Sequence, residues 1–115
     1  PPEIQAALGR ANTLYTKGKV VEASTELSRV VVQCSSIPEP YALLALIYQD
    51  SGAYQEALVF YKLACARDPR NSGNHFEAAR IAGIIGDHTS RLDALRVVAR
   101  LQPNNLNVAI ERARC

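Results

Sequence analysis

The histidine and cysteine side chains are the residues of this sequence best suited to metal or nucleophilic chemistry. His75 and His88 are thirteen residues apart, and no cysteine stands beside either of them. A zinc site needs three or four clustered ligands, so this spacing predicts no metal site. The three cysteines form no Cys-x-x-Cys pair, and an odd number cannot close a complete disulfide framework. We expect them to be small, half-buried hydrophobic residues in a reducing compartment.

No other group of residues has the spacing of a catalytic site. The run Ser72-Gly73-Asn74-His75 brings a hydroxyl near an imidazole, but a loop between helices explains this run better than a nucleophile with a positioned base. The carboxylates are scattered along faces expected to be solvated, which leaves no pair for acid and base catalysis. The sequence therefore predicts a protein that is not an enzyme, with no catalytic, cofactor-binding or metal-binding residues and no cofactor.

Arginines gather in the last third of the chain and raise the alternative of a basic contact surface. They are Arg80, Arg91, Arg96, Arg100, Arg112 and Arg114. The last 40 residues also hold four carboxylates, so the local excess is only +2. The loop-like run Gly83-Ile84-Ile85-Gly86 is similar to an RNA-clamping loop but carries no basic residue. Direct contact with nucleic acid is not expected, and contact of the terminal arginines with an acidic partner stays open.

Length and composition describe one folded domain or one short repeat array. The chain has 115 residues, of which 48% are hydrophobic and 21% charged, and this composition excludes a disordered tail. The net charge of +2 gives no general attraction to a polyanion. No apolar run reaches the roughly 18 residues of a membrane span, so we expect no membrane contact. Because the chain begins with Pro1 and not with methionine, we expect it to be a piece of a longer protein.

A period of 34 residues organises the sequence. Gly18, Gly52 and Gly86 follow it, and so do Pro69 and Pro103. Small residues share the interval, as Ala11, Ala45 and Ala79 do. The period divides the chain into three predicted repeats, 4–37, 38–71 and 72–105, followed by a partial or capping helix at 106–115.

Within each repeat, the apolar residues have helical spacing. Tyr41, Leu44, Ala45 and Tyr48 fall at i, i+3, i+4 and i+7, which marks one buried face of a helix. Gly52 then ends that helix, because a left-handed cap residue costs glycine little. Each of these helices alone is only marginally stable in water. We therefore expect the two helices of a repeat to pack as a hairpin and each hairpin to pack against the next.

This pattern resembles the tetratricopeptide repeat family. The middle repeat carries the family's positions most completely, with Tyr41, Leu44, Ala45 and Tyr48 on its first helix. On its second helix and exit turn it carries Ala57, Tyr61, Ala64 and Pro69. The resemblance implies an all-α solenoid of three helix-turn-helix hairpins plus a C-terminal helix, in a right-handed superhelical segment with a concave face. Arg91 departs from it, because a small alanine is usual there: either its stem reaches outward and the helix tilts, or the helix packs through Ala94.

Projection of the repeat onto the concave face predicts a partner-binding groove. Its site residues are Leu8, Asn12, Tyr15, Leu43, Leu46, Gln49, Phe76, Arg80 and Ile84. Beside them the projection places Gln5, Thr16, Glu39, Ala42, Asp50, Glu77 and Gly83. We expect a helical or extended segment of another protein to lie in this groove, because the apolar residues of the set would be costly to leave in water as one patch. These residues are Leu8, Leu43, Leu46, Phe76 and Ile84.

The family's best-known groove, the carboxylate clamp of the Hsp70 and Hsp90 co-chaperones, is not expected here. Of the positions that correspond to the clamp, only Asn12 fits, and Glu77 would repel a carboxylate. A closer resemblance is to the N-terminal array of the tetratricopeptide subunits of transcription factor IIIC. It is carried by the first two repeats, above all by the run from Glu39-Pro40-Tyr41 to Phe60-Tyr61.

That resemblance implies a nuclear scaffold for RNA polymerase III transcription. Such a scaffold recruits the initiation factor that carries the TATA-binding protein, and its partners would be that factor and sister subunits of a DNA-binding transcription complex. The alternative is an adaptor in another multiprotein assembly, such as cell-division, trafficking or secretion machinery, with a cytoplasmic location.

Overall fold

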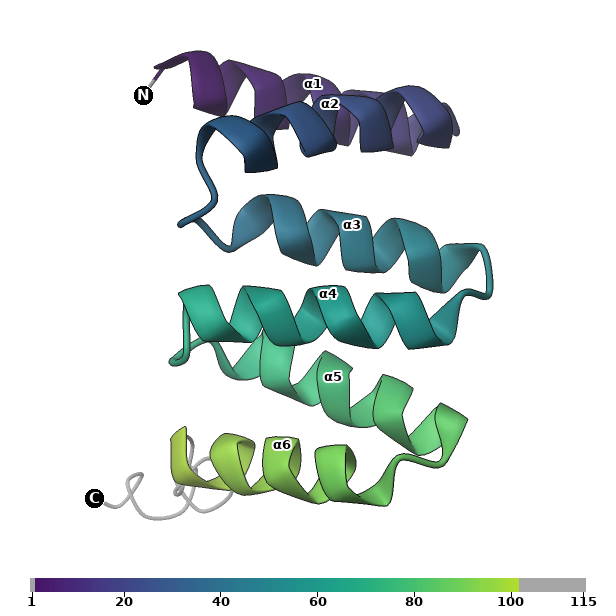
Figure 1. Cartoon of the computed structure of the whole chain (residues 1–115), viewed down its shortest axis with the longest axis vertical. Coiled ribbons are helices and arrows are strands. Elements are labelled where there is room, and N and C mark those ends of the chain that lie inside the picture. The colour runs from purple at the N-terminus through teal and green to yellow at the C-terminus, as the bar shows by residue number, and fades with distance from the viewer. Residues whose placement is uncertain (1, 102–115) are drawn as a thin grey trace, which may run out of the picture.

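Six α-helices form the described part of the chain. The structure, a computed structural model, describes residues 2–101. The helices are α1 (Pro2–Thr16), α2 (Val20–Gln33), α3 (Glu39–Asp50), α4 (Tyr54–Arg67), α5 (Ser72–Ile85) and α6 (His88–Leu101). They pair into three antiparallel hairpins that stack along the long axis of the molecule (Figure 1). The predicted all-α solenoid of hairpins is confirmed. The repeat boundaries stay a prediction, and the segment 106–115 lies outside the described residues.

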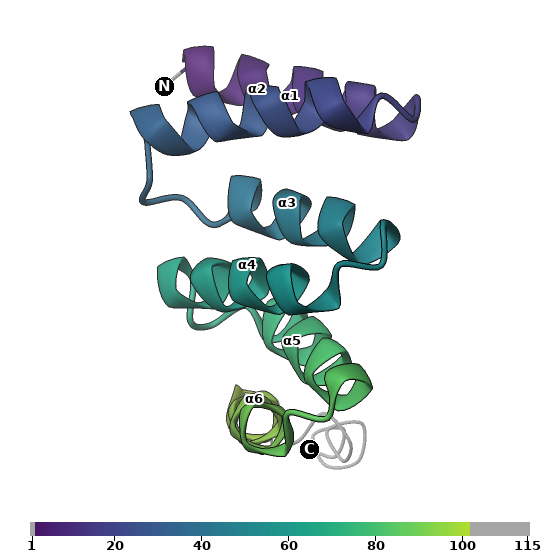
Figure 2. The same cartoon turned by 45° about the vertical axis from the view of Figure 1, so that its right-hand side comes forward.

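The hairpins do not stack in one plane. Figure 2 shows α6 almost end-on while α1 to α4 are still seen from the side, so the last hairpin is rotated relative to the first two. Each helix packs against its neighbours in the chain, and α1 also touches α3. The stack is therefore held by contacts between successive elements, as in a solenoid.

Three equivalent glycines make the turns inside the hairpins. Gly18, Gly52 and Gly86 have φ angles of +80°, +84° and +78°, a conformation that residues with a side chain rarely adopt. The amide after each glycine donates a hydrogen bond to the carbonyl five residues earlier, in the pairs Lys19 to Leu14 (2.8 Å), Ala53 to Tyr48 (2.9 Å) and Asp87 to Ala82 (2.9 Å). This is the Schellman ending of a helix, and its recurrence gives the 34-residue period a structural basis.

Alanines let the two helices of a hairpin approach each other. Ala11 and Ala23 of the first hairpin, and Ala45 and Ala57 of the second, are fully buried. Larger side chains fill the space around them: Tyr61 is buried, and the ring of Tyr48 stacks on that of Phe60 with centroids 5.3 Å apart. Close packing of this kind leaves no room for a larger side chain at the alanine positions.

The third hairpin forms although α6 carries Arg91 where a small residue is usual. Ala94 is the buried residue of α6, so the helix does pack through that alanine. Arg91 is half-buried and lies across Gly83, where an added Cβ would come within 3.2 Å of the arginine Cδ. The missing side chain of Gly83 on α5 is what accommodates the arginine stem.

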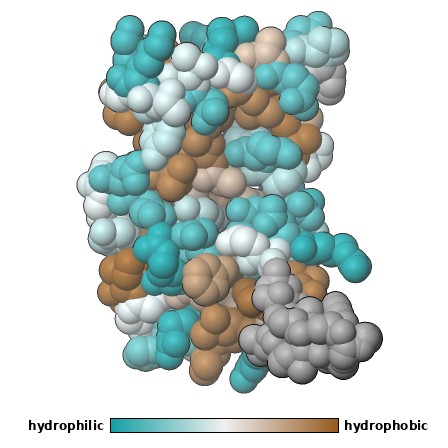
Figure 3. Space-filling view, turned by 180° about the vertical axis from the view of Figure 1, so that it is seen from behind, coloured by the Kyte–Doolittle hydropathy of each residue, from teal (hydrophilic) through white to brown (hydrophobic). Residues whose placement is uncertain are grey.

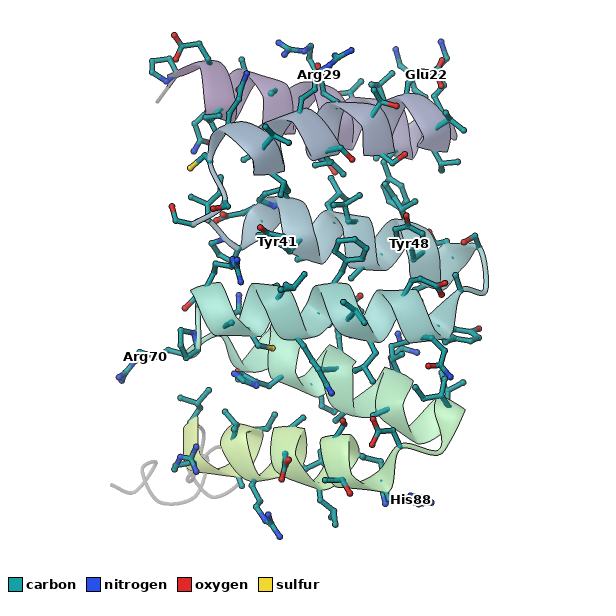
Figure 4. The ribbon with its side chains drawn as sticks, in the orientation of Figure 1. Glu22, Arg29, Tyr41, Tyr48, Arg70 and His88 are labelled. Atoms are coloured by element: carbon teal, nitrogen blue, oxygen red, sulfur yellow. The ribbon has the colours of Figure 1, made fainter. Side chains whose placement is uncertain are left out.

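The loop before α3 is fastened to α4. The guanidinium of Arg67 lies over the ring of Tyr41, 4.5 Å from its centroid, and its Nε donates a hydrogen bond of 2.8 Å to the carbonyl of Ser35. Tyr41 and Tyr48 mark the two ends of α3 in Figure 4. Pro40 follows in the first turn of α3, where its missing N–H breaks no helical bond. These contacts fix the position at which α3 begins.

Candidate partner-binding groove

A hollow of about 530 Å³ opens between α1 and α3, the first helices of the first two hairpins. We call it the α1–α3 hollow, and its lining consists of Gln5, Leu8, Gly9, Asn12, Glu39, Ala42, Leu43 and Leu46. Space arises because Gly9 has no side chain and Ala42 has a short one. An added Cβ at Gly9 would meet no atom within 4 Å.

Each wall of the hollow is one stripe of a helix. On α3, Glu39, Leu43 and Leu46 follow one another at intervals of four and three residues, which places them along the same face. On α1, Gln5, Leu8 and Asn12 follow the same rule. Glu39 is the one charged residue among those that line the hollow. The walls thus combine an aliphatic floor with two amides and one carboxylate.

Figure 3 views the molecule from behind, the side on which α1 lies in front of α2. Apolar and polar surface alternate on this face. Leu8, Leu43 and Leu46 are all half-buried, so part of each side chain is in contact with solvent. Half-exposed leucines around one hollow are typical of a surface that another molecule covers.

A polar cluster lies at the far end of α3. The hydroxyl of Tyr15 on α1 donates a hydrogen bond to the carboxylate of Asp50, and the hydroxyl of Tyr61 on α4 donates one of 3.0 Å to Gln49. The bond to Asp50, together with burial, raises the pKa of Tyr15 to about 12. Burial and the nearby charge of Glu77 raise the pKa of Tyr61 to about 12. Both hydroxyls therefore remain protonated donors at neutral pH.

A second, smaller hollow of about 230 Å³ lies on the third hairpin. This α5–α6 hollow is lined by Phe76, Ala79, Arg80, Gly83, Arg91 and Leu95. The ring of Phe76 is 52% exposed, so an apolar side chain faces solvent there. Arg80 forms an ion pair of 2.8 Å with Glu77, and that hydrogen bond raises the pKa of the guanidinium.

The predicted site residues fall into three places. The structure brings Leu8, Asn12, Leu43 and Leu46 together in the α1–α3 hollow. Tyr15 and Gln49 lie in the polar cluster. The α5–α6 hollow holds Phe76 and Arg80, whereas Ile84 is exposed and lines neither hollow. The binding role of all nine stays a prediction.

Sequence reasoning missed two kinds of lining residue. Gly9 lines the α1–α3 hollow but was not among the residues predicted for the concave face. Arg91 and Leu95 escaped because the projection drew only on the first helix of each repeat, and these residues belong to α6. An exposed pair, Val20 and Val21 on α2, also had no counterpart in the prediction.

His75 and Cys65 lie in surroundings that do not favour metal or nucleophilic chemistry. Within residues 2–101, no three His, Cys, Asp or Glu side chains come together as metal ligands. The ring of His75 is hydrogen-bonded through Nε2 to the carbonyl of Pro69, at 2.9 Å. Burial, with the charge of Asp68, raises the pKa of the Cys65 thiol to about 11, so this thiol carries no thiolate nucleophile at neutral pH. The described helices are too short or too polar to cross a lipid bilayer.

Two arginines of the basic C-terminal third are paired within their own helices. Arg80 contacts Glu77, and Arg96 contacts Asp93 at 3.4 Å, in each case three residues earlier. In Figure 4, Arg70 points away from the body of the molecule at the loop between α4 and α5. Arg112 and Arg114 lie outside the described residues. Two of these arginines are thus paired with a carboxylate, and Arg80 and Arg91 line the α5–α6 hollow.

Known proteins share both the sequence pattern and the fold. Residues 41–71 match the tetratricopeptide repeat family. The chain is 22% identical to general transcription factor 3C polypeptide 3 of Homo sapiens over 113 residues, which is 98% of this chain and 13% of that protein. It is 31% identical to anaphase-promoting complex subunit 3 of Schizosaccharomyces pombe over 65 residues, 56% of this chain and 10% of that protein. The chain therefore spans only about a tenth of these relatives.

Among solved structures, the type III secretion chaperone SycD of Yersinia enterocolitica, in complex with a peptide of the translocator YopD, has the same architecture. The TM-score is 0.81 at 18% identity, and the match covers 99% of this chain and 87% of that one. At this identity the likeness concerns the fold alone.

The stacked hairpins, the equivalent glycine turns and the match of residues 41–71 define the class of the fold: it is a solenoid of helical hairpins whose central repeat matches the tetratricopeptide repeat family. The chain is also similar to the human transcription factor 3C polypeptide named above, and this similarity extends over nearly the whole chain.

Proposed function

We propose that this chain is a non-enzymatic interaction scaffold that holds a segment of a partner protein in the α1–α3 hollow. The observation that carries the proposal is the group of half-exposed leucines, Leu8, Leu43 and Leu46, around an open hollow between two repeats. Apolar concave sites of this size, with a few polar groups that fix orientation, are the usual form of a binding site.

The assembly that we assign to the scaffold is the transcription factor IIIC complex of RNA polymerase III. Similarity to general transcription factor 3C polypeptide 3 along 98% of the chain supports it. In this role the segment works in the nucleus, and its partners are the initiation factor that carries the TATA-binding protein and sister subunits of the complex. Direct contact with DNA or RNA is not part of the proposal.

The second candidate is an adaptor in a different assembly. Similarity to anaphase-promoting complex subunit 3 favours cell-division machinery, and the likeness to a secretion chaperone shows that the same fold can hold a translocator peptide. For either candidate the same hollow is the binding site, and only the identity of the partner differs.

The test is affinity capture from nuclear extract with the wild-type chain and with Leu46→Glu. Leu46 is half-buried at the floor of the hollow, so a carboxylate there is expected to remove partner binding and leave the helical circular dichroism unchanged. Leu63→Glu, which changes a half-buried leucine of α4 outside that hollow, is the control.

Recovery of polymerase III initiation-factor subunits by the wild type, but not by Leu46→Glu, supports the transcription assignment. Recovery of another assembly with the same dependence on Leu46 supports the adaptor candidate. Loss of the helical signal in Leu46→Glu would show that Leu46 belongs to the core. Sub-micromolar, salt-sensitive binding to duplex DNA or single-stranded RNA would contradict the scaffold proposal.

A further inference from the structure

Glu39 is the charged residue that lines the α1–α3 hollow, and Asp50 lies beyond the hollow at the end of α3. The chain has a net charge of +2, but the predicted groove positions carry three carboxylates, Glu39, Asp50 and Glu77, and one guanidinium, Arg80. Arg80 and Glu77 neutralise each other in their ion pair. Among the described residues, no cation pairs with Glu39 or Asp50.

Those two carboxylates bracket the leucines of α3. Glu39, Leu43, Leu46 and Asp50 lie at intervals of four, three and four residues, so all four share one face of the helix. Glu39 is the first residue of α3 and Asp50 the last. At 1.5 Å per residue, about 16 Å of helix separates them. The stripe therefore reads carboxylate, leucine, leucine, carboxylate.

The opposite wall presents amides to the same space. Gln5 and Asn12 of α1 line the hollow on either side of Leu8, and neither side chain is hydrogen-bonded to another described residue. A primary amide both donates and accepts hydrogen bonds, as the backbone of an extended peptide does. A helical ligand satisfies its own backbone and would leave these amides without a protein partner.

From this arrangement, and resting on the proposed function, we infer that the occupant is an extended segment of a partner protein in which apolar residues are flanked on both sides by lysine or arginine. Its aliphatic side chains contact Leu8, Leu43 and Leu46, its backbone pairs with Gln5 and Asn12, and its basic residues meet Glu39 and Asp50. An extended chain rises about 3.3 Å per residue, so the two basic residues stand roughly five positions apart. Charge complementarity of this kind selects among partners more than it adds affinity.

The experiment selects ligands from a random peptide library displayed on phage, with the 115-residue chain as bait. Parallel selections use Leu46→Glu, Glu39→Lys and Glu56→Lys. Glu56 is the matched control because it is an exposed glutamate in the first turn of α4, just as Glu39 is in the first turn of α3, and it does not line the hollow. Circular dichroism of each variant shows whether the fold is kept.

The wild type and Glu56→Lys are expected to enrich peptides with an apolar core between two basic residues. Glu39→Lys is expected to replace one basic position by an acidic one. For a synthetic peptide of the enriched class, exchange of the basic residue that meets Glu39 for glutamate should weaken binding about threefold to tenfold in fluorescence anisotropy, and less at high salt.

The outcomes separate this inference from the proposed function. If no peptide depends on Leu46, the proposed function fails. If Leu46-dependent peptides show no excess of basic residues, or bind Glu39→Lys unchanged, only the inference fails. Helical circular dichroism of the bound peptides, or a concentration-dependent dimer of the chain that Leu46→Glu abolishes, would also overturn the inference.

Discussion

The hydroxyl of Tyr15 on α1 donates a hydrogen bond to the carboxylate of Asp50 at the end of α3, and so joins the first helices of two successive hairpins. Among the described residues, this is the side-chain hydrogen bond that spans α1 and α3. It lies at the end of α3 opposite to Glu39, beyond the aliphatic part of the α1–α3 hollow. The bond therefore links the position of the first hairpin to that of the second.

Alkaline pH is expected to destabilise the chain through Tyr15. Its pKa is raised to about 12 by the bond to Asp50, from an ordinary value of 10.0, and burial raises the pKa of Tyr61 to about 12 as well. A raised pKa means that the stabilisation is fully present below pH 10 and is lost as the pH rises towards 12. Urea unfolding at neutral and alkaline pH measures the loss.

Tyr15→Phe removes one of the two contributions to this pH dependence. The variant should be less stable than the wild type at neutral pH, by about 1 kcal/mol or less, and should lose less stability on alkalisation. An identical loss in the two proteins would show that the bond to Asp50 does not influence the titration.

Overpacking at Ala57 is expected to loosen the middle hairpin. Ala57 is fully buried between α3 and α4, and Ala57→Leu should lower the free energy of unfolding by about 1 to 3 kcal/mol. Ala66→Leu makes the same change at an exposed position of the same helix and should have little effect. Thermal or urea unfolding of the pair checks this, and equal stability of the two variants would contradict the packing.

Two glycine-to-alanine changes are expected to have opposite signs. Gly86 has a φ of +78°, and Gly86→Ala should destabilise the chain by about 1 to 2 kcal/mol. Gly9 lies inside α1 with open space around it, so Gly9→Ala should stabilise the helix by about 0.5 to 1 kcal/mol. Chemical denaturation resolves the difference. Destabilisation by Gly9→Ala would mean that its site is more crowded than the structure shows.

Gly83 and Arg91 are expected to be energetically coupled. A Cβ at residue 83 would lie 3.2 Å from the arginine Cδ, so Gly83→Ala must displace the arginine stem. The gain in helix propensity should therefore be larger in an Arg91→Ala background than in the wild type, by about 0.5 kcal/mol or more. A double-mutant cycle measures this coupling, and additive effects would place Arg91 away from Gly83.

The sequence predicted the helices and turns because their causes are local. A glycine that ends each first helix and an alanine at each close approach act through one or two neighbours, so Gly52 and Ala57 could be assigned from the 34-residue period alone. The leucines of the α1–α3 hollow were found for the same reason. The position of the Arg91 side chain could not be predicted from the sequence, because it depends on the absence of a side chain at Gly83 on another helix. The hollow's depth likewise depends on what Gly9 lacks.

Because each described helix packs against its neighbours in the chain, the stability of residues 2–101 does not depend on one central core. Warming should instead let α6 and α1 fray first, while α3 and α4, covered from both sides, exchange their amide protons last. The helix α3, which carries Leu43 and Leu46, would then stay folded longer than α1, which carries Leu8. A ligand bound between the two helices would slow the unfolding of α1.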